Sequence, residues 1–291
     1  MSASNELLPL AEPLTEEDVG RVLRDAFSED LDETGDITSL SVIPAGVRFS
    51  GVMAARKSCV VAGLPVAQRA FLTLSEEARF APEVNDGAEV DAGQVIAHIE
   101  GPARALLAAE RTALNILQLL SGMATLTRAY VRAIAGTGAV LLDTRKTIPG
   151  LRRLSKYATR MGGAKNHRMG LYDAILIKDN HIAVTGSMAA AVQRAREAGH
   201  AAIEVECDTL EQVREAVEAG ATRILLDNMT PEKLREAVAM VAGRAETEAS
   251  GGVTLDNIRA IAETGVDFIS TSRITMAAPA IDIGLDWRAE S

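Results

Sequence analysis

The sequence is poor in aromatic residues, which make up 3% of its 291 residues, although apolar residues overall make up 47%. Abundant Ala, Val, Leu and Ile with few aromatics favour helices packed on a buried sheet over an aromatic-rich β-sandwich. The apolar fraction is ample for a buried core, and the length suits one large domain or two unequal ones.

Cysteine is equally scarce. Cys59 and Cys207 are the only two, and both lie inside apolar, strand-like segments. There is no CxxC pair, and the four histidines are scattered along the chain. We therefore predict two buried free thiols and no structural zinc site.

Long apolar runs are also missing, and none approaches the length needed to span a bilayer. The acidic N-terminal segment lacks the basic-then-apolar order of a signal peptide. A formal net charge of -10 argues against non-specific binding to nucleic acid or to a membrane surface. We expect a cytoplasmic protein that binds neither.

One stretch departs from this acidic background: residues 140–181, called here the cationic segment. Its basic residues are Arg145, Lys146, Arg152, Arg153, Lys156, Arg160, Lys165, Arg168 and Lys178. Only three aspartates oppose them, Asp143, Asp173 and Asp179. Such a cluster repels itself unless it meets an anion, so it predicts a small polyanionic ligand.

The first hundred residues predict a small α+β domain with an antiparallel sheet. A helix begins after Thr15, its N-cap, and a turn at 35–39 leads into irregular chain. Segments 47–63 and 89–101 have the pattern of strands with Gly-marked turns, and 64–74 that of a helix.

A long helix is predicted from about residue 102 to 135. Arg111 falls on the face that carries Leu107, Leu114 and Leu117. An arginine there is either a rim residue with a buried stem or a charge delivered to a site or subunit interface. On position alone, the rim residue is the more common case.

In the second half, short apolar runs alternate with amphipathic, Gly-terminated helical segments. The runs are 140–144, 174–180, 202–208, 223–228, 245–252 and 267–272. This alternation predicts βαβ units around a parallel sheet, and six strands are enough to close a barrel. Ligands of such sheets bind where the strands meet their following loops.

The predicted strand ends carry three kinds of side chain. Arg145, Lys146 and Lys178 can clamp carboxylates or phosphates. Glu206 and Asp227 can hold sugar hydroxyls, a hydrated magnesium ion or both. Ser250, Gly251 and Gly252 precede a helix expected to start near Thr254, which could receive a phosphate. Singly, each acid could be a strand-end cap and the SGG segment an ordinary loop, but their joint placement favours a site.

These residues lie in motifs that resemble the quinolinate phosphoribosyltransferase family. The motifs are DTRKTIPGLRRLSKYA, GGAKNHRMGLYDAILIKDNH, IEVECDTLEQV, ILLDNM, EASGGVTLDNI and VDFISTS. Upstream, GDITS and ERTALNILQLLSG are similar to the same family, so the resemblance covers nearly the whole chain.

The resemblance implies an α/β fold with two domains. An N-terminal α+β sandwich over residues 1–120 precedes an incomplete α/β barrel of six or seven strands over 121–279, and residues 280–291 pack back on the first domain. It also implies a homodimer in which Arg111 reaches the neighbouring site, with higher assembly left open.

Residue roles are implied as well. The quinolinate-site positions are Arg111, Arg145, His167, Arg168 and Lys178, with Lys146 near the substrates' anionic groups. Glu206 and Asp227 match residues that hold ribose and magnesium, the metal through water or the phosphoribosyl pyrophosphate (PRPP) co-substrate. The 5′-phosphate loops are Ser250, Gly251, Gly252, Thr271 and Ser272. Lys146, Lys178, Glu206 and Asp227 are the implied catalytic residues.

The implied activity is a pentosyltransferase reaction of de novo NAD biosynthesis: PRPP and quinolinate give nicotinate mononucleotide, pyrophosphate and CO2. Two alternatives stay open: a related phosphoribosyltransferase for another base, and a non-catalytic phosphosugar-binding protein. The cationic clamp for a dicarboxylate argues against a phosphoribosyltransferase for another base. A phosphosugar-binding protein would leave Lys146, Lys178, Glu206 and Asp227 unexplained. Many relatives read GALTHSAPALD where this chain has SRITMAAPAID. Ser272 thus replaces a phosphate-loop glycine and Met276 a site histidine.

Overall fold

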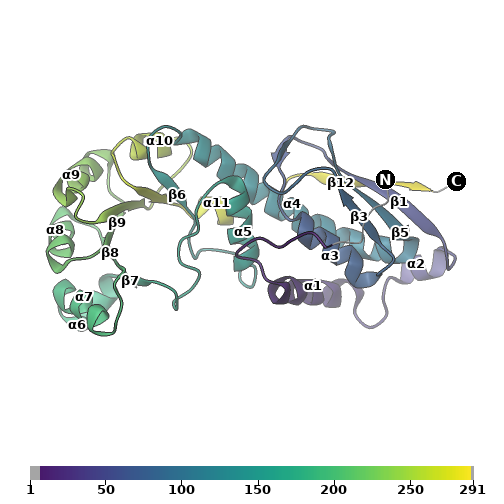
Figure 1. Cartoon of the computed structure of the whole chain (residues 1–291), viewed down its shortest axis with the longest axis horizontal. Helices are drawn as coiled ribbons and strands as arrows, with labels where there is room; N and C mark the ends of the chain where they lie inside the picture. Colours follow the sequence, from purple (N-terminus) through teal and green to yellow (C-terminus); the bar gives the residue numbers. More distant parts are fainter. Residues whose placement is uncertain (1–6, 290–291) are drawn as a thin grey trace. The chain divides into compact units, whose positions relative to one another are not determined.

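The computed structural model describes residues 7–289, which form two compact units (Figure 1). Unit 1 comprises residues 1–127, 148–163 and 278–291, and unit 2 comprises 128–147 and 164–277. The division between residues 120 and 121 that the sequence suggests stays a prediction. No helix within the described residues is both long and apolar enough to cross a membrane.

Unit 1 is built on an antiparallel sheet, as the sequence predicts. Its strand order is β12 (Ile283–Ala289), β1 (Arg48–Ala55), β5 (Val95–Pro102) and β3 (Arg79–Pro82). A second, two-stranded sheet pairs β2 (Cys59–Val60) with β4 (Glu89–Val90). The strands predicted over 47–63 and 89–101 are therefore each divided between the two sheets.

The helices of unit 1 are α1 (Glu16–Leu31), α2 (Ile37–Val42), α3 (Leu64–Leu74) and α5 (Arg152–Gly162), together with most of α4 (Ala103–Ala133). Thr15 caps α1 by accepting the N–H of Asp18. The predicted turn at 35–39 followed by irregular chain is wrong from residue 37 onward, because α2 occupies Ile37–Val42. Asp36 Oδ1 accepts the N–H groups of Thr38 and Ser39, both at 3.0 Å, and so supplies a helix start.

Asp86 and Tyr157 fasten α5 inside unit 1. The Tyr157 hydroxyl donates to Asp86 Oδ2 at 2.5 Å, and the same carboxylate accepts the N–H groups of Gly63 and Leu64 where α3 begins. Burial raises the pKa of Asp86, while these hydrogen bonds oppose the rise. The buried carboxylate therefore depends on its donors for compensation.

Unit 2 is built on a parallel six-stranded sheet in the order β6, β11, β10, β9, β8, β7. Their bounds are Val140–Leu142, Phe268–Ser270, Glu246–Ser250, Arg223–Asp227, Ile203–Cys207 and Ile175–Ile177. Within the described chain β6 and β7 are the sheet's two edges, so the predicted incomplete barrel is confirmed.

The helices of unit 2 include α7 (Met188–Glu197), α8 (Leu210–Ala219) and α9 (Pro231–Val241), which lie outside the curved sheet with α10 (Ile258–Ala262) in Figure 1. Two shorter helices follow strand ends, α6 (Asp179–Thr185) and α11 (Arg273–Met276). Each strand alternates with a helix, which brings all six carboxyl ends to one rim.

The helix predicted to start near Thr254 begins four residues later, at Ile258. Asn257 Oδ1 accepts the Thr254 N–H at 2.8 Å, and Asn257 Nδ2 donates to the Gly252 carbonyl at 2.9 Å. These side-chain hydrogen bonds stabilise a turn in competition with the helix. The SGG segment therefore leads into a turn, and α10 has only five residues.

Candidate functional site

Two neighbouring cavities open at the carboxyl ends of the unit 2 strands. The first, the basic cavity, has a volume of about 380 Å³ and includes Arg145, Lys146, His167, Arg168, Lys178, Glu206 and Asp227 in its lining. The second, the glycine-loop cavity, has a volume of about 370 Å³ and includes Ser250, Gly251, Gly252, Thr271 and Ser272. Lys146, Asp227 and Ser250 line both cavities, which makes them parts of one site.

Lys146 follows β6 and stands between the two cavities with an exposed side chain. Its backbone is held on both sides. Its N–H donates to Thr144 Oγ1 at 3.0 Å, and its carbonyl accepts from Thr275 Oγ1 at 2.7 Å. The backbone of Lys146 is thus fixed while its side chain is exposed, which allows the ammonium group to contact anions in either cavity.

Carboxylates gather opposite the cations. Glu206 in β8 contacts the ammonium of Lys178, which follows β7. Asp227 ends β9, where burial and then the charges of Glu206 and Asp208 raise its pKa. Like charges held together in this way favour a cation, and carboxylate oxygens are the donors that magnesium prefers. The pair therefore fits a magnesium ion held directly or through a ligand.

The glycine-loop cavity depends on two glycines with positive φ. Gly251 has φ +86°, and a Cβ there would lie 2.2 Å from Asn228 Oδ1 and 3.0 Å from the Asn228 backbone nitrogen. Asn228 N in turn donates to the Ser250 carbonyl at 2.8 Å. Gly252 has φ +62° and open space around it. Backbone N–H groups and hydroxyls, and not the N-terminus of a long helix, are what this loop offers a phosphate.

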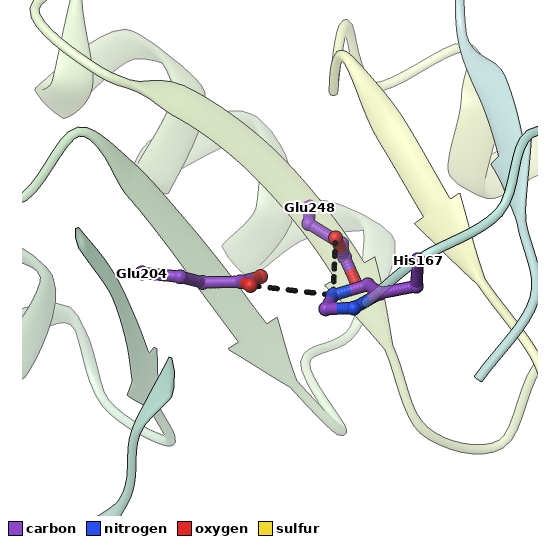
Figure 2. Close-up of side chains that lie close together, drawn as sticks. All are labelled: His167, Glu204 and Glu248. Atoms are coloured by element: carbon purple, nitrogen blue, oxygen red, sulfur yellow. Dashed lines mark ion pairs between the residues drawn. The ribbon is translucent and has the colours of Figure 1, made fainter. Parts of the chain in front are cut away.

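His167 lies against two buried carboxylates that the sequence analysis did not single out (Figure 2). Its Nε2 lies 3.2 Å from Glu204 Oε2 and 3.5 Å from Glu248 Oε2. Glu204 is 6% exposed and Glu248 is completely buried. Burial alone would lower the pKa of His167, but its contacts with the two glutamates outweigh burial and raise it to about 9.

The sequence did contain a signal for both glutamates. Glu204 and Glu206 are two residues apart on one strand, as are Glu248 and Ser250, so each pair points to the same face. A charged residue two positions before a strand-end site residue, on the same face of the strand, predicts a charge beneath the site.

One predicted site residue, Arg111, lies elsewhere, and the two departures from the family pattern can also be located. Arg111 is in α4 within unit 1, and its side chain is exposed while Leu114 and Leu117 on the same helix are buried. Met276, which stands where many relatives have histidine, ends α11 and is 57% exposed. Ser272 adopts φ -83°, so this backbone position does not require glycine.

Comparison with known proteins gives a consistent family. A family model described as "Quinolinate phosphoribosyl transferase, C-terminal domain" matches residues 123–286, and the corresponding N-terminal domain model matches 36–121. A probable nicotinate-nucleotide pyrophosphorylase (carboxylating) of Bacillus subtilis is 44% identical over 268 residues, which is 91% of this chain and 92% of that protein. The nicotinate-nucleotide pyrophosphorylase of Mycobacterium leprae is 43% identical over 91% of this chain and 95% of its own.

Solved structures agree with these relatives. The nicotinate-nucleotide pyrophosphorylase of Francisella tularensis has a TM-score of 0.92 and 37% identity, covering 97% of this chain and all of that one. The corresponding protein of Ehrlichia chaffeensis has a TM-score of 0.90 and 37% identity, covering 95% of this chain and 100% of its own.

Proposed function

The chain belongs to the quinolinate phosphoribosyl transferase family, and we propose that it makes nicotinate mononucleotide for de novo NAD biosynthesis. The reaction transfers the phosphoribosyl group of PRPP to the ring nitrogen of quinolinate. Pyrophosphate and CO2 are the other products. The chain is thus a pentosyltransferase.

The observation that carries the proposal is the division of charge between the two cavities. The basic cavity gathers Arg145, Arg168 and Lys178, and the adjoining cavity gathers glycines and hydroxyls. Quinolinate is a pyridine dicarboxylate, and PRPP carries a 5′-phosphate and a pyrophosphate. Both substrates are polyanions, so they explain why a chain of net charge -10 has a cationic segment.

In the basic cavity, the two arginines bind the carboxylates of quinolinate through paired N–H groups, and Lys178 adds a compact charge. His167 and Lys146 complete this set. In the glycine-loop cavity, the 5′-phosphate meets the backbone of Ser250, Gly251 and Gly252 and the hydroxyls of Thr271 and Ser272.

We propose that Glu206 and Asp227 hold the ribose hydroxyls and a magnesium ion that accompanies PRPP. Their gathered negative charge supports this role, as does their position beside both kinds of anion-binding group. Magnesium, when bound, offsets charge on the departing pyrophosphate. The ammonium of Lys178 and the carboxylate of Glu206 contact each other, which joins the cations of this site to its carboxylates.

The chemistry needs positioning and charge stabilisation more than acid–base groups. The quinolinate nitrogen bonds to C1 of the ribose as the bond from C1 to pyrophosphate breaks, through a cation-like transition state. The positive charge of the resulting pyridinium stabilises the electron pair that stays on the adjacent ring carbon when its carboxylate departs as CO2. A proton then replaces that carboxylate on the ring. Lys146 or Arg145, both at the end of β6, holds the leaving carboxylate out of conjugation with the ring.

The assembly follows from the family resemblance. We expect a homodimer in which Arg111 of one subunit reaches the basic cavity of the other. An exposed arginine on a helix whose neighbouring leucines are buried supports a role beyond packing. We expect the enzyme in the cytoplasm.

A substrate comparison tests the proposal. Purified protein is incubated with PRPP, magnesium and either quinolinate or nicotinate, and mononucleotide and CO2 are measured. Turnover of quinolinate with release of CO2 supports the proposal. Turnover of nicotinate alone would assign the chain to a different phosphoribosyl transfer and overturn it.

A further inference from the structure

We propose that Glu204 and Glu248 are positioning residues that hold His167 and Arg168 against the basic cavity. This inference rests on the proposed function, because it takes the basic cavity to be the quinolinate site. Neither glutamate belongs to the residues that the family resemblance places in contact with substrate. Both lie on strands of the barrel, on β8 and β10, which gives them a rigid base.

The imidazole of His167 is held at both nitrogens. Nδ1 accepts the backbone N–H of Arg168 at 2.7 Å, so the neutral ring carries its proton on Nε2. Nε2 points to the two carboxylates, which approach from different strands (Figure 2). The ring therefore cannot turn without breaking a contact on one side or the other.

The backbone of His167 is held as well. Asp143, completely buried at the end of β6, accepts the His167 N–H at Oδ1 at 2.8 Å. Its Oδ2 accepts from Asn166 Nδ2 at 2.6 Å. His167 is thus pinned between β6 on its backbone side and the glutamate pair on its ring side.

Arg168 is the next residue in the chain, so the contacts that fix His167 also fix the position of Arg168. Its Nη1 donates to the Ala174 carbonyl at 3.1 Å, and its side chain lines the basic cavity. Burial and then the charge of Arg145 lower the pKa of Arg168, while Glu204 and Asp173 oppose them. Glu204 therefore acts on Arg168 through His167, which it contacts and whose Nδ1 accepts the Arg168 N–H.

The same three side chains could suggest a metal centre, since their ligand atoms lie within 4.8 Å of one another. The hydrogen bond to Nδ1 argues against that, because a proton on Nε2 leaves no lone pair there for a metal. The negative charge is partly offset by a protein cation, although both oxygens of Glu248 and Oε1 of Glu204 have no hydrogen-bond partner among the described residues. Arg223 Nη1 lies 3.8 Å from Glu248 Oε2. We therefore assign Glu204, Glu248 and His167 to a cluster that carries a proton on Nε2 and supports the site, and not to a metal centre.

Substitution of the glutamates tests the inference. Glu204→Gln and Glu248→Gln should raise the KM for quinolinate by about tenfold to a hundredfold, because each removes a carboxylate charge that faces His167 Nε2. The KM for PRPP should change by less than about twofold. Glu246→Gln is the matched control, because Glu246 shares β10 and pairs with Arg223 but is exposed. It should behave like wild type.

A second cycle asks whether the effect passes through the histidine. In a His167→Gln background, Glu204→Gln should add little to the KM for quinolinate, because the two residues act as one unit. Fully additive effects would overturn the inference. So would a Glu204 or Glu248 variant that matches the Glu246→Gln control in an enzyme that turns over quinolinate.

Nitrogen NMR of the wild-type protein tests the inference even if the glutamate variants fail to fold. The chain has four histidines, and His167→Gln identifies the signal of interest. A protonated Nε2 supports the inference, and an unprotonated Nε2 overturns it. Absence of any quinolinate turnover by the wild type would instead count against the proposed function, while this measurement would still decide the geometry.

Discussion

Replacement of Gly251 by alanine tests how the glycine-loop cavity is built. Gly251 has φ +86°, where a residue with a Cβ costs about 1–2 kcal/mol. The added Cβ would also meet Asn228 at 2.2 Å on its side chain and 3.0 Å on its backbone nitrogen. Forcing an extra atom into such a contact costs about 1–3 kcal/mol more. We expect the free energy of unfolding to fall by about 2–5 kcal/mol in total.

Function should suffer with stability. Asn228 donates to the Asp227 carboxylate at 2.6 Å and to the Ser250 carbonyl at 2.8 Å, so its displacement moves both sides of the PRPP site. We expect the KM for PRPP to rise by about tenfold to a hundredfold.

The matched control is Gly199→Ala. Gly199 has φ +91° with open space around it and does not line either cavity of the site. Backbone strain alone should lower the free energy of unfolding of this variant by about 1–2 kcal/mol, and its KM for PRPP should not change. Urea unfolding followed by circular dichroism and steady-state kinetics measure the two effects. If both variants lose equal stability and keep equal KM values, the close approach to Asn228 is unimportant and the reasoning fails.

Three further outcomes are expected. Lys146→Ala should lower kcat/KM by more than about tenfold, or 1.4 kcal/mol, and a smaller fall in steady-state assays would remove its central role. Tyr157→Phe should lower the free energy of unfolding of unit 1 by about 1–2 kcal/mol, because the Asp86 carboxylate loses a hydrogen-bond donor. The fluorescence of Trp287, the only tryptophan, reports the unfolding of that unit. An unchanged free energy of unfolding would show that the hydrogen bond contributes nothing. The two glutamates raise the pKa of His167 to about 9 from about 6.5 in the unfolded chain, so a protonated ring contributes at most about 3 kcal/mol of stability, complete below pH 6.5 and lost as the pH rises through 9. The Arg168 N–H donated to Nδ1 favours the neutral ring and opposes this contribution. Urea unfolding over that range should show a larger loss for wild type than for His167→Gln, and equal losses would refute the assignment.

The sequence predicted the architecture of unit 2 because its strands and helices obey local rules. Buried parallel strands give short apolar runs, and the helices between them begin at Ser187, Thr209 and Thr230, each accepting a backbone N–H. Placing the site at the strand ends followed from topology alone. All the predicted site residues except Arg111 line the two cavities, although their roles in binding remain to be tested.

The errors arose where one side chain competes with a regional pattern. Asp36 caps the start of a helix in a segment rich in turn formers. Asn257 accepts the N–H of Thr254 and stabilises a turn there, so the next helix begins later in the sequence than predicted. The glutamates beneath the site were missed for a different reason. Their meaning depends on His167, which approaches them from a segment 37 residues before Glu204, and only the fold brings the three together.

The most direct test of the proposed activity follows the carboxylate that must leave. Quinolinate labelled with ¹³C in the carboxylate next to the ring nitrogen is incubated with the protein, PRPP and magnesium. The account predicts labelled CO2 in equal amounts with nicotinate mononucleotide and pyrophosphate, and none when PRPP is omitted. Retention of the label in the mononucleotide, or product formed from nicotinate and not from quinolinate, would contradict it.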